Sequence, residues 1–275
     1  MRRSGGAVVL RTDNAGHVVS RASVRRLQKD WVAPLRHTVK AYRTRVGPSL
    51  HSVYVRGSVA VGRAVPGASD IDTLAVVRDH VPLSIEWADD IARTVTRRWP
   101  YVAGVEVCLY PIGAVERTGR LAALIKTQCG CLYGTDLSAR IRGFAPGIDL
   151  LFHAWDLPRD LAVARRALAP QNDAGAVGEI CAWVMKRLVR SGFELVMARE
   201  GCYTRDLAAC QRRFARHYPA EAPLMAEAVR LAVHGGNRGE CLAVIDGLGE
   251  WLFDQICQEY GAARIAQLMA ERARP

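Results

Sequence analysis

Two acidic residues stand one position apart, at Asp70 and Asp72, directly after the glycine-rich stretch RGSVAVGRAVPGAS (56–69). On a β-strand, side chains at positions i and i+2 point to the same face. Two carboxylates held that close repel each other, and a cation relieves the repulsion. The spacing therefore predicts a cation partner, and carboxylate oxygens suit Mg²⁺, which proteins often share with substrate phosphates.

Gly57 and Ser58 follow the apolar segment HSVYV (51–55) and open a predicted short helix. The first N–H groups of a helix are unpaired and favour phosphate oxygens, and glycine lets the backbone approach closely. A third acid, Glu106, lies within VAGVEVCLY (102–110), where burial without a partner costs several kcal/mol. If that strand lies beside the strand of Asp72, three carboxylates can surround two metal ions, an arrangement for in-line nucleotidyl transfer.

Segments with strand and helix patterns alternate around these residues. Apolar periodicity predicts a helix over 21–46, with Pro34 as the point where it can split or kink, and a hairpin over 7–19. Strands at 51–55, 71–77 and 102–110 alternate with helices at 84–99 and 113–128, which indicates an α/β fold with a mixed sheet. Only helical patterns follow Pro146, so we expect an α/β catalytic domain over 1–145 and an all-helical bundle domain over 146–275.

The positive charge of the chain is concentrated in its first half. The 275 residues carry 38 Lys and Arg against 27 Asp and Glu, a net charge of +11. Residues 1–145 hold 22 basic and 11 acidic side chains, whereas residues 146–275 hold 16 of each. Such an excess suits an anionic partner or is a solvated surface. A basic stripe on the predicted 21–46 helix is either a surface for an anionic partner or a solvated face; its residues are Arg25, Lys29, Arg36, Lys40 and Arg43.

Cysteine spacing and apolar runs exclude other classes of protein. The 8 cysteines form no CxxC pair and no histidine stands at metal-ligand spacing, so a zinc site is not expected and a reducing compartment is. No apolar run approaches the length of a membrane span or of a signal-peptide core. We therefore expect a cytoplasmic protein without a membrane partner, and the sequence carries no signal for an oligomeric state.

Gly57-Ser58, eleven intervening residues and then Asp70-Ile71-Asp72 with an apolar strand resemble the signature of the DNA polymerase β-type nucleotidyltransferase superfamily. Glu106 matches the third strand-borne carboxylate of that family in order and context. The segments CLYGTDL (131–137) and KRLVRSGFELVMAREGCYTRDL (186–207) resemble stand-alone bacterial nucleotidyltransferases with a C-terminal helical domain, including those that modify aminoglycosides.

The resemblance implies an enzyme that transfers a nucleoside monophosphate, AMP in the first instance, from ATP or another triphosphate to an acceptor hydroxyl, with release of pyrophosphate. It implies two Mg²⁺ ions, or Mn²⁺ in their place. The family pattern gives the site residues two roles: metal binding and catalysis by Asp70, Asp72 and Glu106, and nucleotide binding by Gly57, Ser58, Ser69, Lys186 and Tyr203.

Three functions remain open at this point. The acceptor is a small molecule in the first, and an RNA 3′ end or a protein side chain in the second, which the basic stripe favours. The third is a non-catalytic nucleotide- or RNA-binding module, against which an intact set of acids argues. A polycationic aminoglycoside would need an acidic pocket, for which the local candidates are Asp136, Asp149, Glu194 and Asp206.

Overall fold

The structure is a computed structural model that describes residues 8–78, 85–117, 119–168 and 174–272. Internal packing divides the chain into two units. One is Val19–Phe144, and the other joins the N-terminal segment up to Val18 to the chain from Ala145 onward. Within the described ranges, no helix combines the length and the apolar character that crossing a membrane requires.

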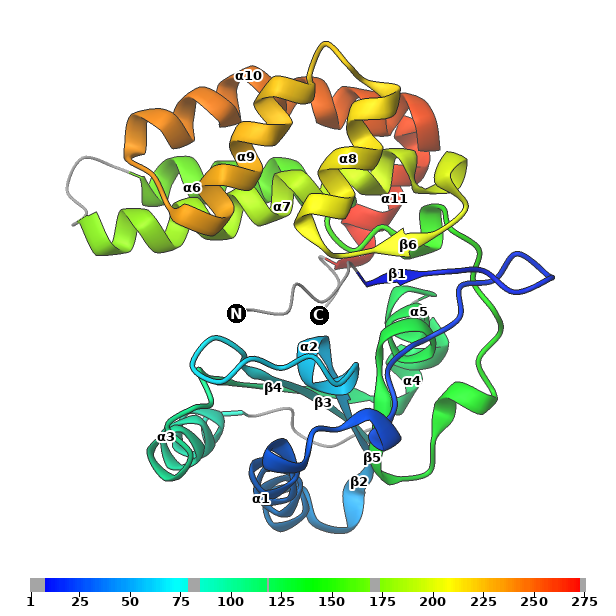
Figure 1. The fold of residues 1–275 in the computed structure, drawn as a ribbon. Coiled ribbons are helices and arrows are strands. Elements are labelled where there is room, and N and C mark those ends of the chain that lie inside the picture. The colour runs from blue at the N-terminus through cyan, green and yellow to red at the C-terminus, as the bar shows by residue number, and fades with distance from the viewer. Residues whose placement is uncertain (1–7, 79–84, 118, 169–173, 273–275) are drawn as a thin grey trace. The chain divides into compact units, whose positions relative to one another are not determined.

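The Val19–Phe144 unit is built on a mixed four-stranded sheet with the order β4-β3-β2-β5 (Figure 1). Strand β2 pairs antiparallel with β3 and with β5, while β3 and β4 are parallel. The predicted mixed sheet is therefore confirmed. Its strands are β2 (Leu50–Arg56), β3 (Ile71–Val77), β4 (Val105–Pro111) and β5 (Gly130–Gly134).

Helices α1 (Lys29–Val46) and α3 (Ala88–Arg98) cover one face of this sheet (Figure 1). Ile71, Ala75 and Val77 of β3 are fully buried in the core beneath them. Because side chains alternate along a strand, Asp72 lies on the opposite face, away from α1 and α3. The apolar period of β3 thus fixes which way its carboxylate points.

Helix α1 runs without a break through Pro34, where the sequence allowed a split or a kink. Proline has no N–H for the carbonyl four residues earlier, here that of Asp30. The hydroxyl of Tyr101 donates a hydrogen bond to this carbonyl at 2.6 Å and takes the place of the missing donor. The predicted helix over 21–46 is shorter in the structure, with only a 3₁₀ turn, η1 (Val24–Arg26), before it.

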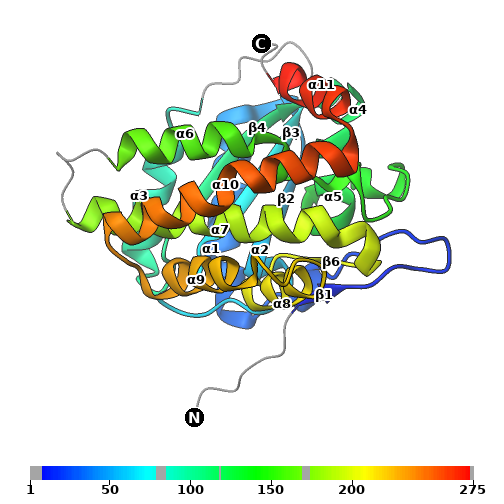
Figure 2. The same cartoon turned by 90° about the horizontal axis from the view of Figure 1, so that it is seen from above.

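The second unit is a helical bundle around the long helix α7 (Ala174–Glu200), which packs against α6, α8, α9 and α10 (Figure 2). Val184, Leu188, Phe193 and Val196 of α7 are fully buried. The helical character predicted for this half is confirmed. Its remaining helices are α6 (Leu157–Ala167), α8 (Leu207–His217), α9 (Ala222–His234), α10 (Arg238–Tyr260) and α11 (Ala262–Arg272).

Short elements differ from the sequence expectations. The helix predicted over 113–128 corresponds to α4 (Ile112–Arg117) and α5 (Gly119–Gln128), with position 118 outside the described residues, and β5 was not predicted as a strand. In place of the hairpin predicted over 7–19, the described residues form a turn whose two ends, Thr12 and Val18, make an isolated antiparallel bridge. Strand β1 (Val9–Leu10) pairs with β6 (Tyr203–Thr204), so residues 8–18 pack with the helical unit rather than with the sheet, where the sequence had placed them. Positions 7 and 84, the predicted starts of two elements, lie outside the described residues.

Candidate functional site

Three charged residues form a row across three neighbouring strands of the sheet. Arg56 on β2 is the direct partner of Asp72 on β3, which is in turn the partner of Glu106 on β4. Direct partners share a face, so the three side chains meet on the face opposite α1 and α3. Nη2 of Arg56 lies 3.4 Å from Oδ1 of Asp72 and donates a short hydrogen bond to Oε2 of Glu106. The parallel pairing that would bring Glu106 beside Asp72 is therefore present.

Arg56 is the cation partner of both carboxylates in this structure. Its side chain and that of Asp72 are 17% and 16% exposed, whereas that of Glu106 is 45% exposed. Burial disfavours the charged guanidinium, but the carboxylates of Asp72 and Glu106 outweigh it and raise the pKa of Arg56. One guanidinium nitrogen thus supplies the positive charge on which two carboxylate oxygens converge.

Glu106 is held from its own strand as well. The thiol of Cys108, two residues further along β4, lies 3.6 Å from Oε1 of Glu106. Burial and then the negative charge of Glu106 raise the pKa of Cys108 to about 11, so the thiol keeps its proton and donates a hydrogen bond to the carboxylate. Both oxygens of Glu106 therefore have a donor, one of them charged.

A buried hydrogen-bond network behind the row joins β3 to β4. The hydroxyl of Thr73 donates to the carbonyl of Glu106 at 2.7 Å and lies 3.0 Å from the hydroxyl of Tyr42, a fully buried residue of α1. The N–H of Cys108 donates to the same tyrosine oxygen at 3.3 Å. Burial raises the pKa of Tyr42, which stays protonated. This network fixes the register that sets Asp72 beside Glu106.

Glycine is the residue type that fits at position 57, where β2 has ended and the short helix α2 (Gly57–Ala60) begins. Its φ of +73° lies in the left-handed region, and an added Cβ would overlap Oδ2 of Asp72. The hydroxyl of Ser58 donates to that of Ser69 at 3.0 Å, and Ser69 also accepts from the N–H of Val65 at 2.9 Å. The two predicted nucleotide-binding serines are thus bonded to each other and tie α2 to the segment before β3.

Asp70 is exposed and directly precedes β3. The residues on both sides of it bond to the segment before β4: the carbonyl of Ser69 accepts from Ala103 at 3.0 Å, and the N–H of Ile71 donates to Gly104 at 2.8 Å. If the extended backbone of β3 continues through Asp70, the i, i+2 spacing sets Asp70 and Asp72 on the same face. In the part of the chain that the structure describes, however, no three His, Cys, Asp or Glu side chains are grouped to hold a metal ion. The three-carboxylate metal site stays a prediction.

The two remaining candidates belong to the helical unit. Lys186 lies half-buried on α7. Tyr203 is only 1% exposed, and its ring packs edge-on against Phe152 and Phe193. Burial in the core explains the ring of Tyr203 without a ligand, so its predicted contact with a nucleotide gains no support from its position.

The four acids considered for an aminoglycoside pocket lie on separate elements of the chain. Asp136 accepts from the N–H of Ser138, and Asp206 caps α8 by accepting from Ala209, both at 2.9 Å. Glu194 is 1% exposed and accepts from backbone N–H groups. The fourth, Asp149, lies in the 3₁₀ turn Ile148–Leu150. Asp136, Glu194 and Asp206 thus each have a local structural role.

Sequence reasoning missed Arg56, Cys108 and Tyr42. The signal for Arg56 was present, because a charged residue ends an otherwise apolar strand directly before Gly57. The paired acids at 70 and 72 are equally typical of a metal site, so their spacing does not indicate an arginine as the cation. Cys108 and Tyr42 gave no separate signal, because both fit an apolar period.

Comparison with solved structures finds similar chains, among them two that are described as nucleotidyltransferases. A spectinomycin adenyltransferase, AAD(9), from Enterococcus faecialis, crystallised with ATP and spectinomycin, is 12% identical over 82% of this chain and 98% of its own, with a TM-score of 0.47. A nucleotidyltransferase-like protein from Exiguobacterium sibiricum is 15% identical over 87% and 81%, with a TM-score of 0.35. No family model and no curated protein matches the sequence. Function is therefore inferred below from the residues of the site.

Proposed function

We propose that the protein transfers a nucleoside monophosphate, AMP in the first instance, from a nucleoside triphosphate to an acceptor hydroxyl, with release of pyrophosphate. The observation that carries this proposal is the convergence of Asp72 and Glu106 on one positive charge beside Gly57. The two acids supply the oxygen ligands that Mg²⁺ prefers, and the absent Cβ of Gly57 leaves room against one of them. The donor set therefore fits a divalent metal, with Asp70 on the same face as a third ligand.

A metal ion bound there would neutralise the triphosphate and polarise the acceptor hydroxyl. The N–H groups of Gly57 and Ser58 hold phosphate oxygens at the start of α2. Glu106, the most exposed carboxylate of the row, accepts the proton of the acceptor hydroxyl. The hydroxyl oxygen then bonds to the α-phosphorus as the bond to the pyrophosphate oxygen breaks.

Arg56 competes with the metal for the same oxygen atoms. Its guanidinium contacts Oδ1 of Asp72 and Oε2 of Glu106, so a divalent ion that binds these two oxygens would displace it from them. A planar guanidinium suits phosphate oxygens as well as carboxylates. Arg56 therefore keeps the two acids together before substrate arrives and is free to pair with the triphosphate afterwards.

The proposed acceptor is a small molecule that does not carry several positive charges, because the acids that could recognise a polycation have structural partners. A macromolecular acceptor, an RNA 3′ end or a protein side chain, is the second candidate. The observation that favours it is the set of exposed basic side chains on α1.

The test is to incubate the protein with each α-labelled triphosphate and Mg²⁺ in the presence of a small-molecule extract, total RNA or cell protein. We expect magnesium-dependent pyrophosphate release and label in one of the three fractions. The double variant Asp70→Asn/Asp72→Asn should keep its circular dichroism spectrum and lose the reaction. Turnover by this variant at the wild-type rate would overturn the proposed function.

A further inference from the structure

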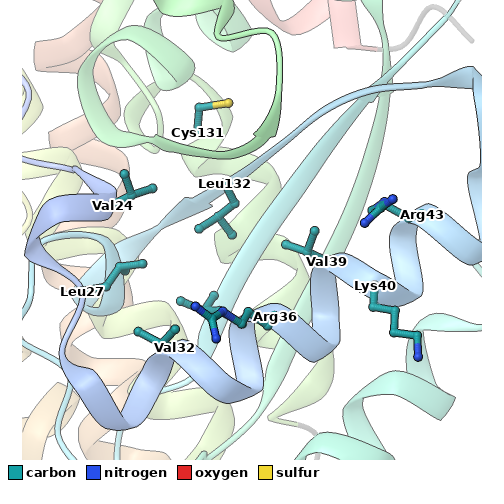
Figure 3. Close-up of a pocket in the computed structure, with 10 residues that line it drawn as sticks. Val24, Leu27, Val32, Arg36, Val39, Lys40, Arg43, Cys131 and Leu132 are labelled. Atoms are coloured by element: carbon teal, nitrogen blue, oxygen red, sulfur yellow. The ribbon is translucent and has the colours of Figure 1, made fainter.

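A groove lies between the η1–α1 segment and strand β5 of the sheet unit (Figure 3). Its volume is about 450 Å³, and an adjoining hollow of about 530 Å³ shares two of its basic residues, Lys40 and Arg43. We call it the α1–β5 groove. One wall comes from Val24, Leu27 and the exposed side of α1, and the other from Cys131 and Leu132.

Three cations of the groove have no acidic partner among the residues that the structure describes. Arg36, Lys40 and Arg43 are exposed and recur at i, i+4 and i+7, which sets them on one side of α1. Across the described ranges none of them forms an ion pair with a carboxylate, and no acid lines the groove. The pKa of the neighbouring His37 is lowered by burial and by the charges of Arg98 and Lys40. The groove is therefore a region of positive potential, in contrast to the neutralised Arg56.

Apolar and aromatic surface is exposed beside these cations. Val24 is 45% exposed on one side and Tyr133, at the end of β5, is 37% exposed on the other. The guanidinium of Arg43 lies over the ring of Tyr133, 5.0 Å from its centroid. Val39 and Leu132 line the groove between them. Exposed apolar surface bordered by charge is typical of a binding site.

We infer that the α1–β5 groove binds single-stranded nucleic acid. A row of cations matches the repeated negative charge of a phosphate backbone, and an exposed aromatic ring with an arginine beside it is a platform on which a base can stack. A duplex keeps its bases stacked inside, and an anionic membrane presents a flat surface, so neither uses both features. Tyr133 pairs with Val53 in the middle of β2, and the groove lies on the α1 side of the sheet, whereas Arg56 lies on the opposite face. The inference does not depend on the proposed transfer reaction.

The test is fluorescence anisotropy of a labelled oligouridylate titrated with the full chain at several salt concentrations. We expect binding at low salt and a linear fall of log affinity with log salt, because bound phosphates release counterions. The variant Arg36→Gln/Lys40→Gln/Arg43→Gln should bind at least about tenfold more weakly and with a smaller salt slope. The matched control Arg93→Gln/Arg97→Gln/Arg117→Gln removes three exposed charges elsewhere in the same unit and should change affinity far less.

Tyr133→Leu keeps every charge and tests the stacking platform on its own. We expect about tenfold weaker binding with an unchanged salt slope. This variant also serves if the triple variant fails to fold, which circular dichroism would reveal. Equal affinity of the two triple variants, equal affinity for a duplex of the same length, or binding to anionic vesicles but not to the oligonucleotide would each overturn the inference. Asp70→Asn/Asp72→Asn should bind the oligonucleotide like the wild type, which separates this test from that of the proposed function.

Discussion

Each unit of the protein holds a glutamate whose charge is compensated, but by different kinds of partner. Glu106 in the sheet unit is 45% exposed and is compensated by side chains, the guanidinium of Arg56 and the thiol of Cys108. Glu194 in the helical unit is 1% exposed. It accepts backbone N–H bonds of 2.8–3.1 Å from residues 152–154 and lies 2.7 Å from Nδ1 of His153.

The kind of partner, backbone or side chain, determines which carboxylate can exchange it for another cation. Backbone N–H groups cannot leave Glu194 without unfolding the segment that carries them, so its compensation is permanent and stabilises the fold. A side chain can rotate away from Glu106 at small cost, and the exposed carboxylate can then accept another cation. We therefore propose a functional role for Glu106 and its row and a stabilising role for Glu194.

The largest effect is expected at the row. Asp72→Asn removes one charge of the pair and should lower the proposed transfer rate about a thousandfold or more, equivalent to about 4 kcal/mol of barrier. Stability should change little, because Arg56 keeps Glu106 as a partner. Pyrophosphate release measures the rate, and Asp89→Asn, an exposed acid of α3, is the control. A rate loss shared by both variants would count against the assignment.

The opposite pattern is expected for Glu194→Gln. The amide would point a donor at backbone donors in a fully buried position, so the free energy of unfolding should fall by about 3 kcal/mol. Urea denaturation measures this loss. Glu179→Gln, an exposed position on the same helix, should leave stability nearly unchanged. A Glu194→Gln variant as stable as its control would show that the N–H groups of residues 152–154 contribute no net stability through Glu194.

Stability should also depend on pH through His153. Burial lowers the pKa of this imidazole to about 4, although the neighbouring Glu194 favours the charged form. The unfolded chain, with a pKa near 6.5, then binds the proton first as the pH falls. The stabilisation is complete above pH 6.5 and is lost progressively toward pH 4, by up to about 3 kcal/mol. Replacing His153 by Gln should flatten the unfolding profile in this window, whereas the exposed control His234→Gln should keep the wild-type slope.

The positions of Asp72 and Glu106 in the row can be predicted from the sequence. The groups that compensate the charges of Glu106 and Glu194 cannot. The apolar period of 71–77 and 102–110 gave the strands, and chain order suggested the pairing that sets Glu106 beside Asp72. Arg56 was missed because a strand-end arginine is equally compatible with solvent. The cradle of Glu194 was missed because its donors stand about forty residues away in an irregular segment. The two-residue pair β1–β6 is too short to leave a periodic signal.

A smaller effect is expected from Gly57→Ala. Alanine at a φ of +73° costs about 1 kcal/mol in the backbone, and its Cβ would also displace the carboxylate of Asp72. Gly67→Ala is the matched control, because Gly67 has a φ of +77° and nothing within 4 Å of an added Cβ. Urea denaturation should show a loss for both variants, larger for Gly57→Ala, and only Gly57→Ala should also lose activity. Equal activity in the two variants would mean that the position of Asp72 against Gly57 is not critical.

A Mn²⁺ titration followed by electron paramagnetic resonance measures the metal affinity of the row without turnover, and so tests whether the row is the metal site. If Arg56 occupies the position that the metal takes, Arg56→Gln should bind Mn²⁺ about tenfold more tightly than the wild type, because the competing charge is gone. Asp72→Asn should bind it far more weakly, and Arg93→Gln should match the wild type. Unchanged Mn²⁺ affinity in both Arg56→Gln and Asp72→Asn would contradict the claim that this row of charges is the metal site.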